Sequence, residues 1–454
     1  MDTFAGKRVA IIGAGRSGTA AARALVQHGA QVQVFDRKLH AEIENTETLT
    51  ALGVSIYPQT DTPSSLQGYD LVIVSPGVPP KHPIFALADT AGVPVWSEIE
   101  LGYQIARAPI IAITGTNGKT TTTLLVHHIL HTMGRRTHLC GNIAGVDGEQ
   151  TLTEAAEQAA SDEWLVAEVS SFQLLRTHAF RPKIAVITNI RHDHLDYHGS
   201  WDAYARAKAQ MLAHQTSEDW AVLNGADEGI RWLIEQGLAG AAQKRLFAEG
   251  NPIVKLSGKK LNIATVQKPA LQGMHGLENA LAAASVASIL ACTPEVLCEA
   301  LGSFKGAPHR MEWVGTWDGV RYINNSMCTN ADALEKSLLA VEEPCIVIAG
   351  GVDKNDSIAQ LAESLARHAA QVLLTGRDGA AIGAALDAVG YTRWQYVGDL
   401  AHAVSEARRL ARAGDTVVLA PGCASFDQFR NFADRGEQFK RLVREVHGCD
   451  NPIH

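Results

Sequence analysis

Residues 108–123 read Ala-Pro-Ile-Ile-Ala-Ile-Thr-Gly-Thr-Asn-Gly-Lys-Thr-Thr-Thr-Thr. The apolar, β-branched run at 110–113 is typical of a strand that is buried on both faces. Glycines at 115 and 118 interrupt this run, and the apolar spacing from residue 120 onward indicates a helix. A strand, a glycine turn, a lysine and a hydroxyl at a helix start are the parts of a phosphate-binding loop. We therefore expect this segment to bind a nucleoside triphosphate, although a tight turn with a chance lysine has the same local pattern.

The composition is that of an ordinary globular protein. The chain has 454 residues, of which 46% are hydrophobic and 19% charged, so we expect about three domains with ample cores. The net charge of −8 argues against nucleic acid or an anionic membrane as the main partner. The seven cysteines include no C-x-x-C pair, which favours reduced thiols over disulfides or a cysteine zinc site. No signal peptide is recognisable, and the longest apolar stretch is shorter than the roughly 18 residues of a membrane span, so we expect a cytoplasmic protein.

The first hundred residues carry a second nucleotide-binding pattern. A strand at 8–12 is followed by Gly13-x-Gly15-x-x-Gly18, an alanine-rich helix, and a strand at 32–35 that ends in Asp36. This order is the fingerprint of a dinucleotide fold, in which glycines let a pyrophosphate approach the helix N-terminus. A further strand at 70–75 ends in a Ser-Pro-Gly turn, at the edge where ligands of open α/β sheets bind. We place this first domain at 1–106.

A central domain at 107–306 opens with the phosphate loop. A strand at 164–169 contains Glu168 near its end, and a strand at 183–188 precedes a loop rich in His and Asp. A helix at 201–214 carries Lys208. The segment 273–279 then precedes an alanine-rich helix, and we expect Asn279 in its first turn.

The remaining residues, 307–454, predict a third α/β unit with strands at 320–323, 345–349, 371–375 and 416–420. The predicted fold is therefore α/β with three domains. These are a Rossmann-like domain, a central domain of the phosphate-loop ATPase type with a mainly parallel sheet, and a Rossmann-like C-terminal domain.

Two nucleotide-type loops on separate domains restrict the function. A nicotinamide-dependent dehydrogenase explains the first loop only, and a plain nucleoside triphosphatase explains the second only. An ATP-dependent enzyme whose other substrate carries a nucleoside diphosphate uses both loops. A nucleotide-binding regulatory protein without activity is a further alternative.

Several motifs together resemble the Mur ligases of peptidoglycan synthesis. They are Thr-Gly-Thr-Asn-Gly-Lys-Thr-Thr, Glu-Val-Ser-Ser-Phe-Gln, His-Asp-His-Leu-Asp, Gly-Met-His-x-x-x-Asn, His-Arg-Met-Glu and Pro-Gly-Cys-Ala-Ser-Phe-Asp-Gln-Phe. The resemblance spans the whole chain in order. It implies ATP-dependent amide synthesis through an acyl phosphate. Length and the Ser-Pro-Gly turn are most similar to the members that add D-glutamate to UDP-N-acetylmuramoyl-L-alanine, with L-glutamate as the alternative acceptor.

The resemblance also implies site residues. The ATP site would contain Gly115, Thr116, Asn117, Gly118, Lys119, Thr120, Thr121, Asn279, Arg310 and Asn325. Magnesium, expected as two ions, would be held by Thr120, Glu168, His194 and a carbamylated Lys208. The catalytic residues would be Lys119, Glu168, His194 and Lys208.

The two other substrates would occupy the outer domains. The UDP-linked substrate would meet Gly15, Arg16, Ser17, Asp36, Arg37, Ser75, Pro76 and Gly77, and its reacting end would lie near Asn142. The incoming glutamate would meet Thr329, Lys354, Ser425 and Phe432.

Simpler interpretations exist for some of these residues. The cluster of His192, His194 and His198 with two aspartates could be a zinc site or a merely solvated loop. Lys208 would ordinarily be an exposed charge on a helix, and Asp36 could be a plain loop residue.

Three positions depart from the family pattern. Gly276 stands where an asparagine is common near the adenine. Asn325 replaces an aspartate and Met327 replaces a lysine in the same loop, which we interpret as a compensated exchange of charge.

Overall fold

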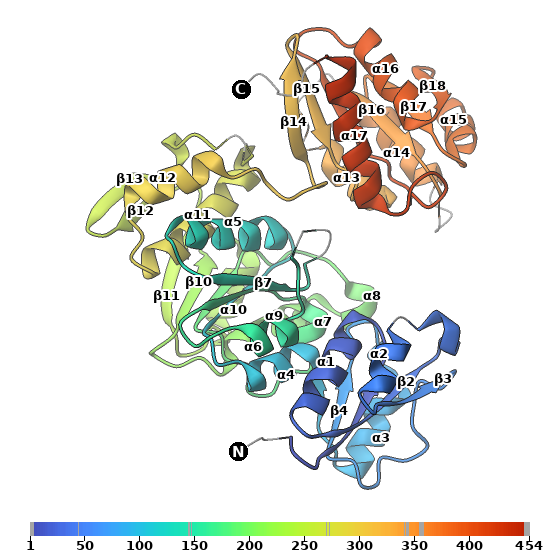
Figure 1. Ribbon diagram of the computed structural model, residues 1–454. Helices are drawn as coiled ribbons and strands as arrows, with labels where there is room; N and C mark the ends of the chain where they lie inside the picture. The colour runs from blue at the N-terminus through green and yellow to red at the C-terminus, as the bar shows by residue number, and fades with distance from the viewer. Residues whose placement is uncertain are drawn as a thin grey trace. The chain divides into compact units, whose positions relative to one another are not determined.

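The computed structural model describes residues 4–43, 45–143, 146, 148–268, 270–271, 273–339, 341, 345–353 and 358–448. The chain divides into two compact units, Met1–Phe304 and Lys305–His454 (Figure 1). The α/β class with parallel sheets in the first unit and a mixed sheet in the second confirms the predicted fold class. The predicted domain boundaries after residues 106 and 306 stay predictions.

The first unit begins with a five-stranded parallel sheet in the order β3-β2-β1-β4-β5. Its strands are β1 (Arg8–Ile12), β2 (Gln31–Asp36), β3 (Ser55–Pro58), β4 (Leu71–Val74) and β5 (Val95–Ser97). The helices are α1 (Arg16–Gln27), α2 (Thr46–Ala51), α3 (Pro83–Ala91) and α4 (Glu98–Ile105), with a 3-10 turn at His40–Glu42. From β1 the chain first adds β2 and β3 on one side of β1, and then adds β4 and β5 on the opposite side of β1. The β1–β4 crevice is therefore the switch point where ligands bind in such sheets.

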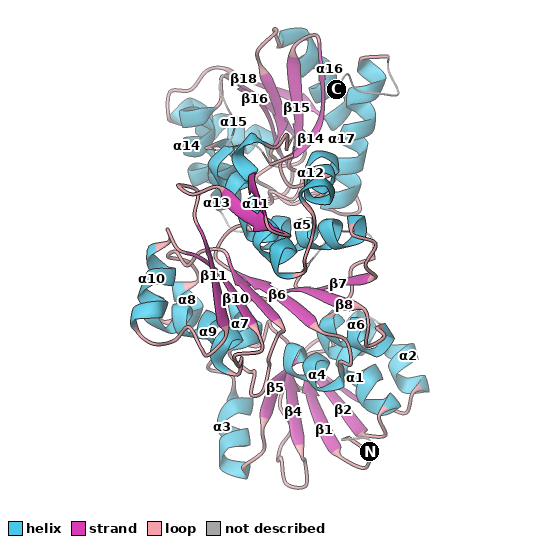
Figure 2. Cartoon of the chain, turned by 90° about the vertical axis from the view of Figure 1, so that its left-hand side faces the viewer, coloured by secondary structure: helices cyan, strands magenta, loops and turns pink. Residues whose placement is uncertain are grey.

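The central sheet of the first unit has six parallel strands in the order β11-β10-β9-β6-β8-β7 (Figure 2). Its strands are β6 (Ile110–Thr114), β7 (Thr137–Gly141), β8 (Trp164–Glu168), β9 (Ile184–Ile187), β10 (Trp220–Asn224) and β11 (Gln243–Phe247). Strand β6 lies in the interior of the sheet, and all five of its residues are buried, as the apolar run predicts. Its neighbours β8 and β9 deliver their carboxyl ends to the same edge.

Helices and a small hairpin complete the first unit. The helices are α5 (Lys119–Thr132), α6 (Leu152–Gln158), α7 (Ser171–Leu174), α8 (Leu195–His198), α9 (Trp201–Ala213), α10 (Glu228–Glu235), α11 (Gly273–Ile289) and α12 (Pro294–Ser303). The antiparallel hairpin pairs β12 (Ile253–Leu256) with β13 (Lys259–Asn262), followed by a 3-10 turn at Ile263–Thr265.

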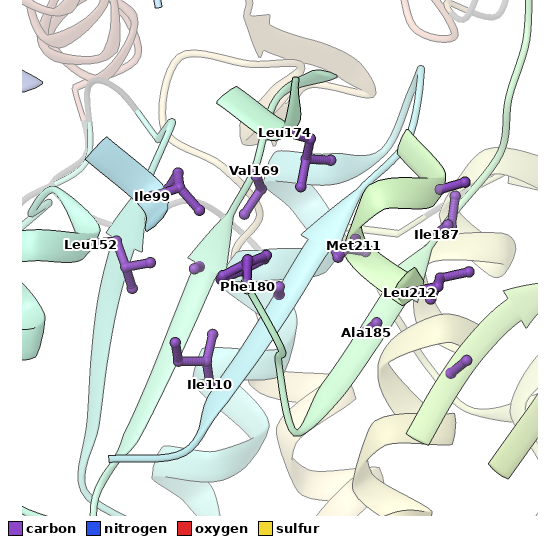
Figure 3. Packing of buried hydrophobic residues seen from close by; sticks show 14 of the residues in the cluster. Ile99, Ile110, Leu152, Val169, Leu174, Phe180, Ala185, Ile187, Met211 and Leu212 are labelled. Carbon is purple, nitrogen blue, oxygen red and sulfur yellow. The ribbon is translucent and has the colours of Figure 1, made fainter. Parts of the chain in front are cut away.

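One hydrophobic cluster joins the central sheet to the helix that leaves the first sheet. It contains Ile99 of α4, Leu152 of α6, Ile110 of β6 and Phe180, all buried (Figure 3). The Thr153 amide at the start of α6 also donates to the buried carboxylate of Glu98, at 2.6 Å. Helix α4 therefore packs into the core of the central sheet, and the first two sheets belong to one unit.

The second unit has a six-stranded sheet in the order β14-β15-β19-β16-β17-β18. Its strands are β14 (Glu312–Trp317), β15 (Val320–Asn324), β16 (Cys345–Gly350), β17 (Gln371–Thr375), β18 (Trp394–Gly398) and β19 (Thr416–Leu419). Among the strand pairs of this sheet that the structure describes, only β14–β15 is antiparallel. The helices are α13 (Ala331–Leu338), α14 (Ile358–His368), α15 (Gly379–Ala388), α16 (Leu400–Leu410) and α17 (Phe432–Val446).

One boundary prediction is wrong. Helix α11 begins at Gly273, so Asn279 lies almost two turns inside the helix and not in its first turn. The prediction placed the helix start at the alanine-rich run, whose residues 280–284 are buried, whereas the helical backbone already includes residues 273–279. None of the helices in the described ranges is long and apolar enough to cross a membrane.

Candidate active site

The phosphate-binding loop connects β6 to α5 and requires glycine at two positions. Gly115 has φ 155°, and a Cβ there would lie 1.9 Å from the Thr188 hydroxyl oxygen. Gly118 has φ 81°, and its Cβ would lie 2.3 Å from Asn279 Oδ1. Gly118 is the N-cap of α5, and no side chain caps this helix. The amides at the start of α5 are therefore available to an anion, as a phosphate-binding loop requires.

The carboxyl end of β9 holds this loop in shape. The Asn117 amide donates to Asn189 Oδ1 at 2.8 Å, and the Thr188 hydroxyl donates to the Asn117 carbonyl at 2.6 Å. The Thr116 amide donates to the Asn189 carbonyl at 2.9 Å. The loop is thus held from outside by hydrogen bonds that do not involve a ligand.

Two lysines converge on one carbonyl oxygen of the loop. Lys119 Nζ donates to the carbonyls of Gly115 at 3.1 Å and Thr116 at 3.0 Å. Lys208 Nζ, from α9, donates to the same Gly115 carbonyl at 2.8 Å. Lys208 is 1% exposed, so the interpretation of an exposed helix charge is wrong. Burial, followed by the charge of Lys119, holds the pKa of Lys208 well below its ordinary value, so the neutral amine is favoured.

A buried carboxylate lies beside the loop. The parallel register pairs Ile113 of β6 with Glu168, the last residue of β8. Glu168 is 3% exposed, and its Oε2 accepts from the Thr120 hydroxyl at 2.7 Å. Its Oε1 accepts from Asn142 Nδ2 at 3.3 Å. A hydroxyl and a carboxylate at the start of a phosphate-binding helix are the protein ligands that Mg²⁺ takes in such sites.

His194 follows β9, in the loop rich in His and Asp. It is exposed and has a left-handed backbone with φ 50°. Its Nε2 is 3.7 Å from Asp193 Oδ2, and its ring centroid is 4.9 Å from that of Phe172. Within the described ranges, no group of three His, Cys, Asp or Glu side chains is placed to hold a metal ion. The side chain of Asp196 lies outside the described residues, so the zinc interpretation of this loop stays an untested alternative.

The three glycines of the first nucleotide-type loop differ in what surrounds them. At Gly13 a Cβ would lie 2.8 Å from Ser75 Oγ, and at Gly18 it would lie 1.9 Å from the Gly13 carbonyl. At Gly15, the N-cap of α1, a Cβ would meet nothing within 4 Å. Close contacts with neighbouring backbone and side-chain atoms therefore explain why glycine is needed at positions 13 and 18. No such contact exists at Gly15, where the space next to the N-terminus of α1 is open.

Two charged residues near this loop, Asp36 and Arg16, bond to other parts of the chain. Both carboxylate oxygens of Asp36 accept backbone N–H groups, from Ala14 at 2.7 Å and from Lys38 at 2.8 Å. Arg16 Nη1 lies 2.6 Å from Glu149 Oε1 and donates to the Ile143 carbonyl at 3.3 Å. Ser17, Ser75 and Pro76 are half-buried, and Arg37 and Gly77 are exposed.

Helix α11 contacts the phosphate loop and the start of α5 through Asn279. Asn279 Oδ1 accepts from the Thr122 hydroxyl at 3.2 Å, and Thr121 is half-buried. At Gly276, a Cβ would lie 2.2 Å from the Leu271 carbonyl oxygen. The close approach of this carbonyl explains why glycine occupies the position where an asparagine is common.

The predicted residues of the second unit lie on loops at the carboxyl edge of its sheet. Asn325 is 4% exposed; it accepts from the Met311 amide at 3.1 Å and donates to Ser337 Oγ at 2.6 Å. The exposed Arg310 has its Nη2 at 3.4 Å from Met327 Sδ. Asn325 and Met327, the two positions of the proposed compensated exchange of charge, thus bond to different residues.

The residues predicted to bind the glutamate substrate differ in their exposure to solvent. Thr329 is exposed and Ser425 is buried. Phe432 begins α17, and its carbonyl accepts from the Ser326 hydroxyl at 2.7 Å. Lys354 lies outside the described residues.

Two features of the site have no counterpart in the sequence predictions. Tyr204 OH lies 3.1 Å from Thr116 Oγ1, and burial raises its pKa to about 12. Its ring also lies under Lys208, with Nζ 4.6 Å from the centroid. The spacing of four residues between Tyr204 and Lys208 on one helix was the available signal. The role of the β9 end in holding the loop depends on sheet order, which local patterns do not give.

Family models match the chain along most of its length. The N-terminal domain of MurD-like Mur ligases matches residues 7–97, the Mur ligase middle domain 113–287, and the Mur ligase glutamate ligase domain 309–423. With the phosphate-binding loop, these matches define an ATP-dependent, amide-forming ligase of three α/β domains. The chain belongs to the Mur ligase family, whose members use ATP and Mg²⁺.

Two relatives of the chain share one name. The chain is 40% identical to the UDP-N-acetylmuramoylalanine–D-glutamate ligase of Pelotomaculum thermopropionicum, over 98% of each chain. It is 36% identical to the enzyme of that name from Bacillus subtilis, over 94% of this chain and 95% of the other. The solved UDP-N-acetylmuramate–alanine ligase of Thermotoga maritima is similar in fold, with a TM-score of 0.54, 20% identity, and coverage of 97% and 99%.

Proposed function

We propose that this protein joins D-glutamate to UDP-N-acetylmuramoyl-L-alanine at the expense of ATP. The observation that carries the proposal is the convergence of Lys119 and Lys208 on the Gly115 carbonyl, next to the buried Thr120–Glu168 pair. The relatives named above catalyse this step according to their names. The phosphate loop supports the ATP site, and the open space at Gly15 supports a UDP site.

The reaction would proceed in two steps. A carboxylate oxygen of the alanyl group attacks the γ-phosphorus of ATP, the bond to the β-phosphate oxygen breaks, and ADP leaves. The amine of glutamate then attacks the acyl carbon of the acyl phosphate, inorganic phosphate leaves, and the nitrogen loses a proton. In both steps the protein would mainly position the reactants and stabilise negative charge.

Each residue near the loop has a proposed part in this chemistry. Lys119 and the first amides of α5 would hold the outer phosphates of ATP. Thr120 and Glu168 would hold Mg²⁺, which supplies positive charge to the transferring phosphoryl group. Asn142, fixed against Glu168, would meet the reacting end of the UDP-linked substrate.

Lys208 would be carbamylated. A neutral amine adds to CO₂ and releases one proton, and the low pKa of Lys208 favours that neutral amine. The carbamate is an anion, so it would be attracted to the neighbouring Lys119 ammonium, whereas a charged Lys208 would be repelled by it. Its oxygens and His194 would then contribute to a second Mg²⁺.

The other substrates would bind at the carboxyl edges of the outer sheets. The UDP-linked substrate would occupy the β1–β4 crevice, where Arg16 adds positive charge and Asp36 fixes the loop. Glutamate would meet Thr329, Lys354, Ser425 and Phe432. We place the reaction in the cytoplasm, because it consumes ATP.

Phosphate release tests the proposal. We expect release from ATP and Mg²⁺ only when UDP-N-acetylmuramoyl-L-alanine and D-glutamate are both present, with L-glutamate much slower. Lys119→Ala is the negative control and should lose at least about 100-fold in rate. Release without the amino acid would indicate a plain triphosphatase, and faster release with L-glutamate would overturn the stereochemistry. Tight NAD binding without any response to the UDP compound would favour a dehydrogenase.

A further inference from the structure

Arg435 in the first turn of α17 is a buried arginine. It is 3% exposed. Burial lowers its pKa to about 10, so it still carries its charge at neutral pH. Among the described residues, no carboxylate lies within ion-pair distance of its guanidinium. An apolar side chain would fill this space without the free-energy cost of removing a charge from water. The presence of an arginine here therefore calls for an explanation other than packing.

The guanidinium bonds to two separate loops. Nε and Nη2 donate to the hydroxyl and the carbonyl of Ser326, at 3.0 and 2.9 Å. Nη1 and Nη2 both donate to the carbonyl of Cys423, at 3.1 Å each. Ser326 follows β15 and Cys423 follows β19, and these strands are parallel neighbours. The planar fork of arginine therefore fixes the distance between the two loops at the carboxyl edge of the sheet.

A third loop closes on the same group. Gly351, which follows β16, has φ 130°, and a Cβ there would lie 3.4 Å from Arg435 Nη1. The Gly351 Cβ would also lie 2.2 Å from the carbonyl oxygen of Ala424. The guanidinium thus lies where loops from three adjacent strands meet.

These loops carry the residues proposed for the acceptor. Thr329 follows Ser326 by three residues, and Ser425 follows Cys423 by two. The Ser326 hydroxyl, which accepts from Arg435, donates to the carbonyl of Phe432. One side chain therefore connects the two loops and the start of α17, and it brings a positive charge to the place where an acidic amino acid would bind.

We infer that Arg435 is the positioning residue of the acceptor pocket, holding the loops after β15 and β19 at the spacing that a dicarboxylic amino acid requires. This inference rests on the proposed function. Arg435 acts through the loops and does not itself touch the substrate.

The test compares three variants of the full chain. Arg435→Lys keeps the charge but cannot donate to both loops in a fork. Ser326→Ala removes one acceptor and leaves the arginine in place. Arg441→Lys is the matched control, since Arg441 lies on the same helix, is exposed and pairs only with Glu445 at 3.5 Å among the described residues.

We expect Arg435→Lys to raise the KM for D-glutamate at least tenfold, and Ser326→Ala to raise it severalfold. The KM for ATP and for UDP-N-acetylmuramoyl-L-alanine should stay within twofold of wild type, as should every parameter of Arg441→Lys. If Arg435→Lys does not fold, Ser326→Ala tests the inference by the same criterion, which is a rise in the KM for D-glutamate without a rise in the KM for ATP or for UDP-N-acetylmuramoyl-L-alanine.

Two outcomes would overturn the inference, and they are distinguishable. If wild type releases phosphate with D-glutamate but the variants lose only thermal stability, without a selective rise in the KM for glutamate, Arg435 is structural. If wild type shows no glutamate-dependent release at all, the proposed function fails and this inference fails with it.

Discussion

At the scale of single residues, the site depends on one carbonyl oxygen that accepts from two lysines. The charge of Lys119 raises the free energy of a second ammonium nearby, and burial of Lys208 adds to that cost. The protein can lower this cost in two ways. Lys208 can remain a neutral amine, or it can become an anion by carbamylation.

Lys208→Ala distinguishes these two states. If the lysine supplies a carbamate, the variant should lose at least about 100-fold in turnover, because a charge near the transferring phosphoryl group disappears. Short-chain carboxylates added to the assay should restore part of the rate. The measurement is phosphate release against carboxylate concentration, with ¹³C NMR of wild type in labelled CO₂ as a direct readout.

Two controls accompany this prediction. Lys208→Arg keeps a positive charge that cannot be carbamylated, and it should stay inactive with carboxylates present. Lys260→Ala removes an exposed lysine of β13 and should change nothing. A fully active Lys208→Ala would return this residue to a structural role.

At the scale of elements, α11 and α12 offer a matched pair of helical glycines. At Gly276 a Cβ would lie 2.2 Å from the Leu271 carbonyl oxygen, whereas at Gly302 the nearest atom, the Gln267 carbonyl oxygen, is 3.9 Å away. Gly276→Ala should therefore lower the free energy of unfolding by about 1–3 kcal/mol through overpacking. Gly302→Ala should raise it by up to about 1 kcal/mol, since alanine favours helix. Urea unfolding of both variants gives the two signs, and equal signs would contradict the packing argument.

Helix α5 carries a pH-dependent contribution to stability. His127 is half-buried, and its Nδ1 lies 2.9 Å from the Thr137 hydroxyl. Burial first, and then the neighbouring His131, His128 and His138, lower the pKa of His127 to about 4. The folded state favours the neutral ring. Its contribution is therefore complete above the unfolded pKa of about 6.5 and is lost as the pH falls towards 4.

We expect the free energy of unfolding of wild type to fall between pH 6.5 and pH 4, with at most about 3 kcal/mol due to His127. His127→Asn should remove this part of the pH dependence, whereas the exposed His131→Asn should leave most of it. Urea unfolding at several pH values measures the difference. Parallel curves for wild type and His127→Asn would show that His127 does not titrate in this way.

Local patterns predicted the elements whose signal is local. The buried run of β6 and the glycines of its loop predicted the strand, turn and helix that the structure shows, because the three follow each other directly. The edge strands β3 and β18 are short and contain no buried residue, so they lack the buried apolar run that marks the interior strands. The burial of Lys208 and the hydrogen bonds of Asn325 depend on packing between distant segments, and no pattern within one element shows them.

At the scale of the whole molecule, the chain forms two units with separate hydrophobic cores. Residues proposed for the UDP substrate and the phosphates lie in the first unit, and those proposed for glutamate lie in the second. Both nucleotide-type loops thus belong to one unit, while the acceptor pocket belongs to the other. The second unit has its own sheet, with helices packed against it and a buried cluster that includes Val347, Leu374 and Val418. Its fold therefore does not depend on burial against the first unit.

Residues 305–454 expressed alone should fold as a cooperative unit. The six-stranded sheet is complete within this fragment, and its interior strand β19 pairs with β15 and β16 on its two sides. Urea unfolding should show a single transition, by far-ultraviolet circular dichroism and by tryptophan fluorescence alike, to which Trp313, the buried Trp317 and Trp394 all contribute. The fragment 305–411 lacks β19 and α17, so β15 and β16 lose their common partner, and this fragment should show no cooperative transition. A non-cooperative melt of 305–454 would contradict the prediction, and it would mean that the second unit needs the first in order to fold.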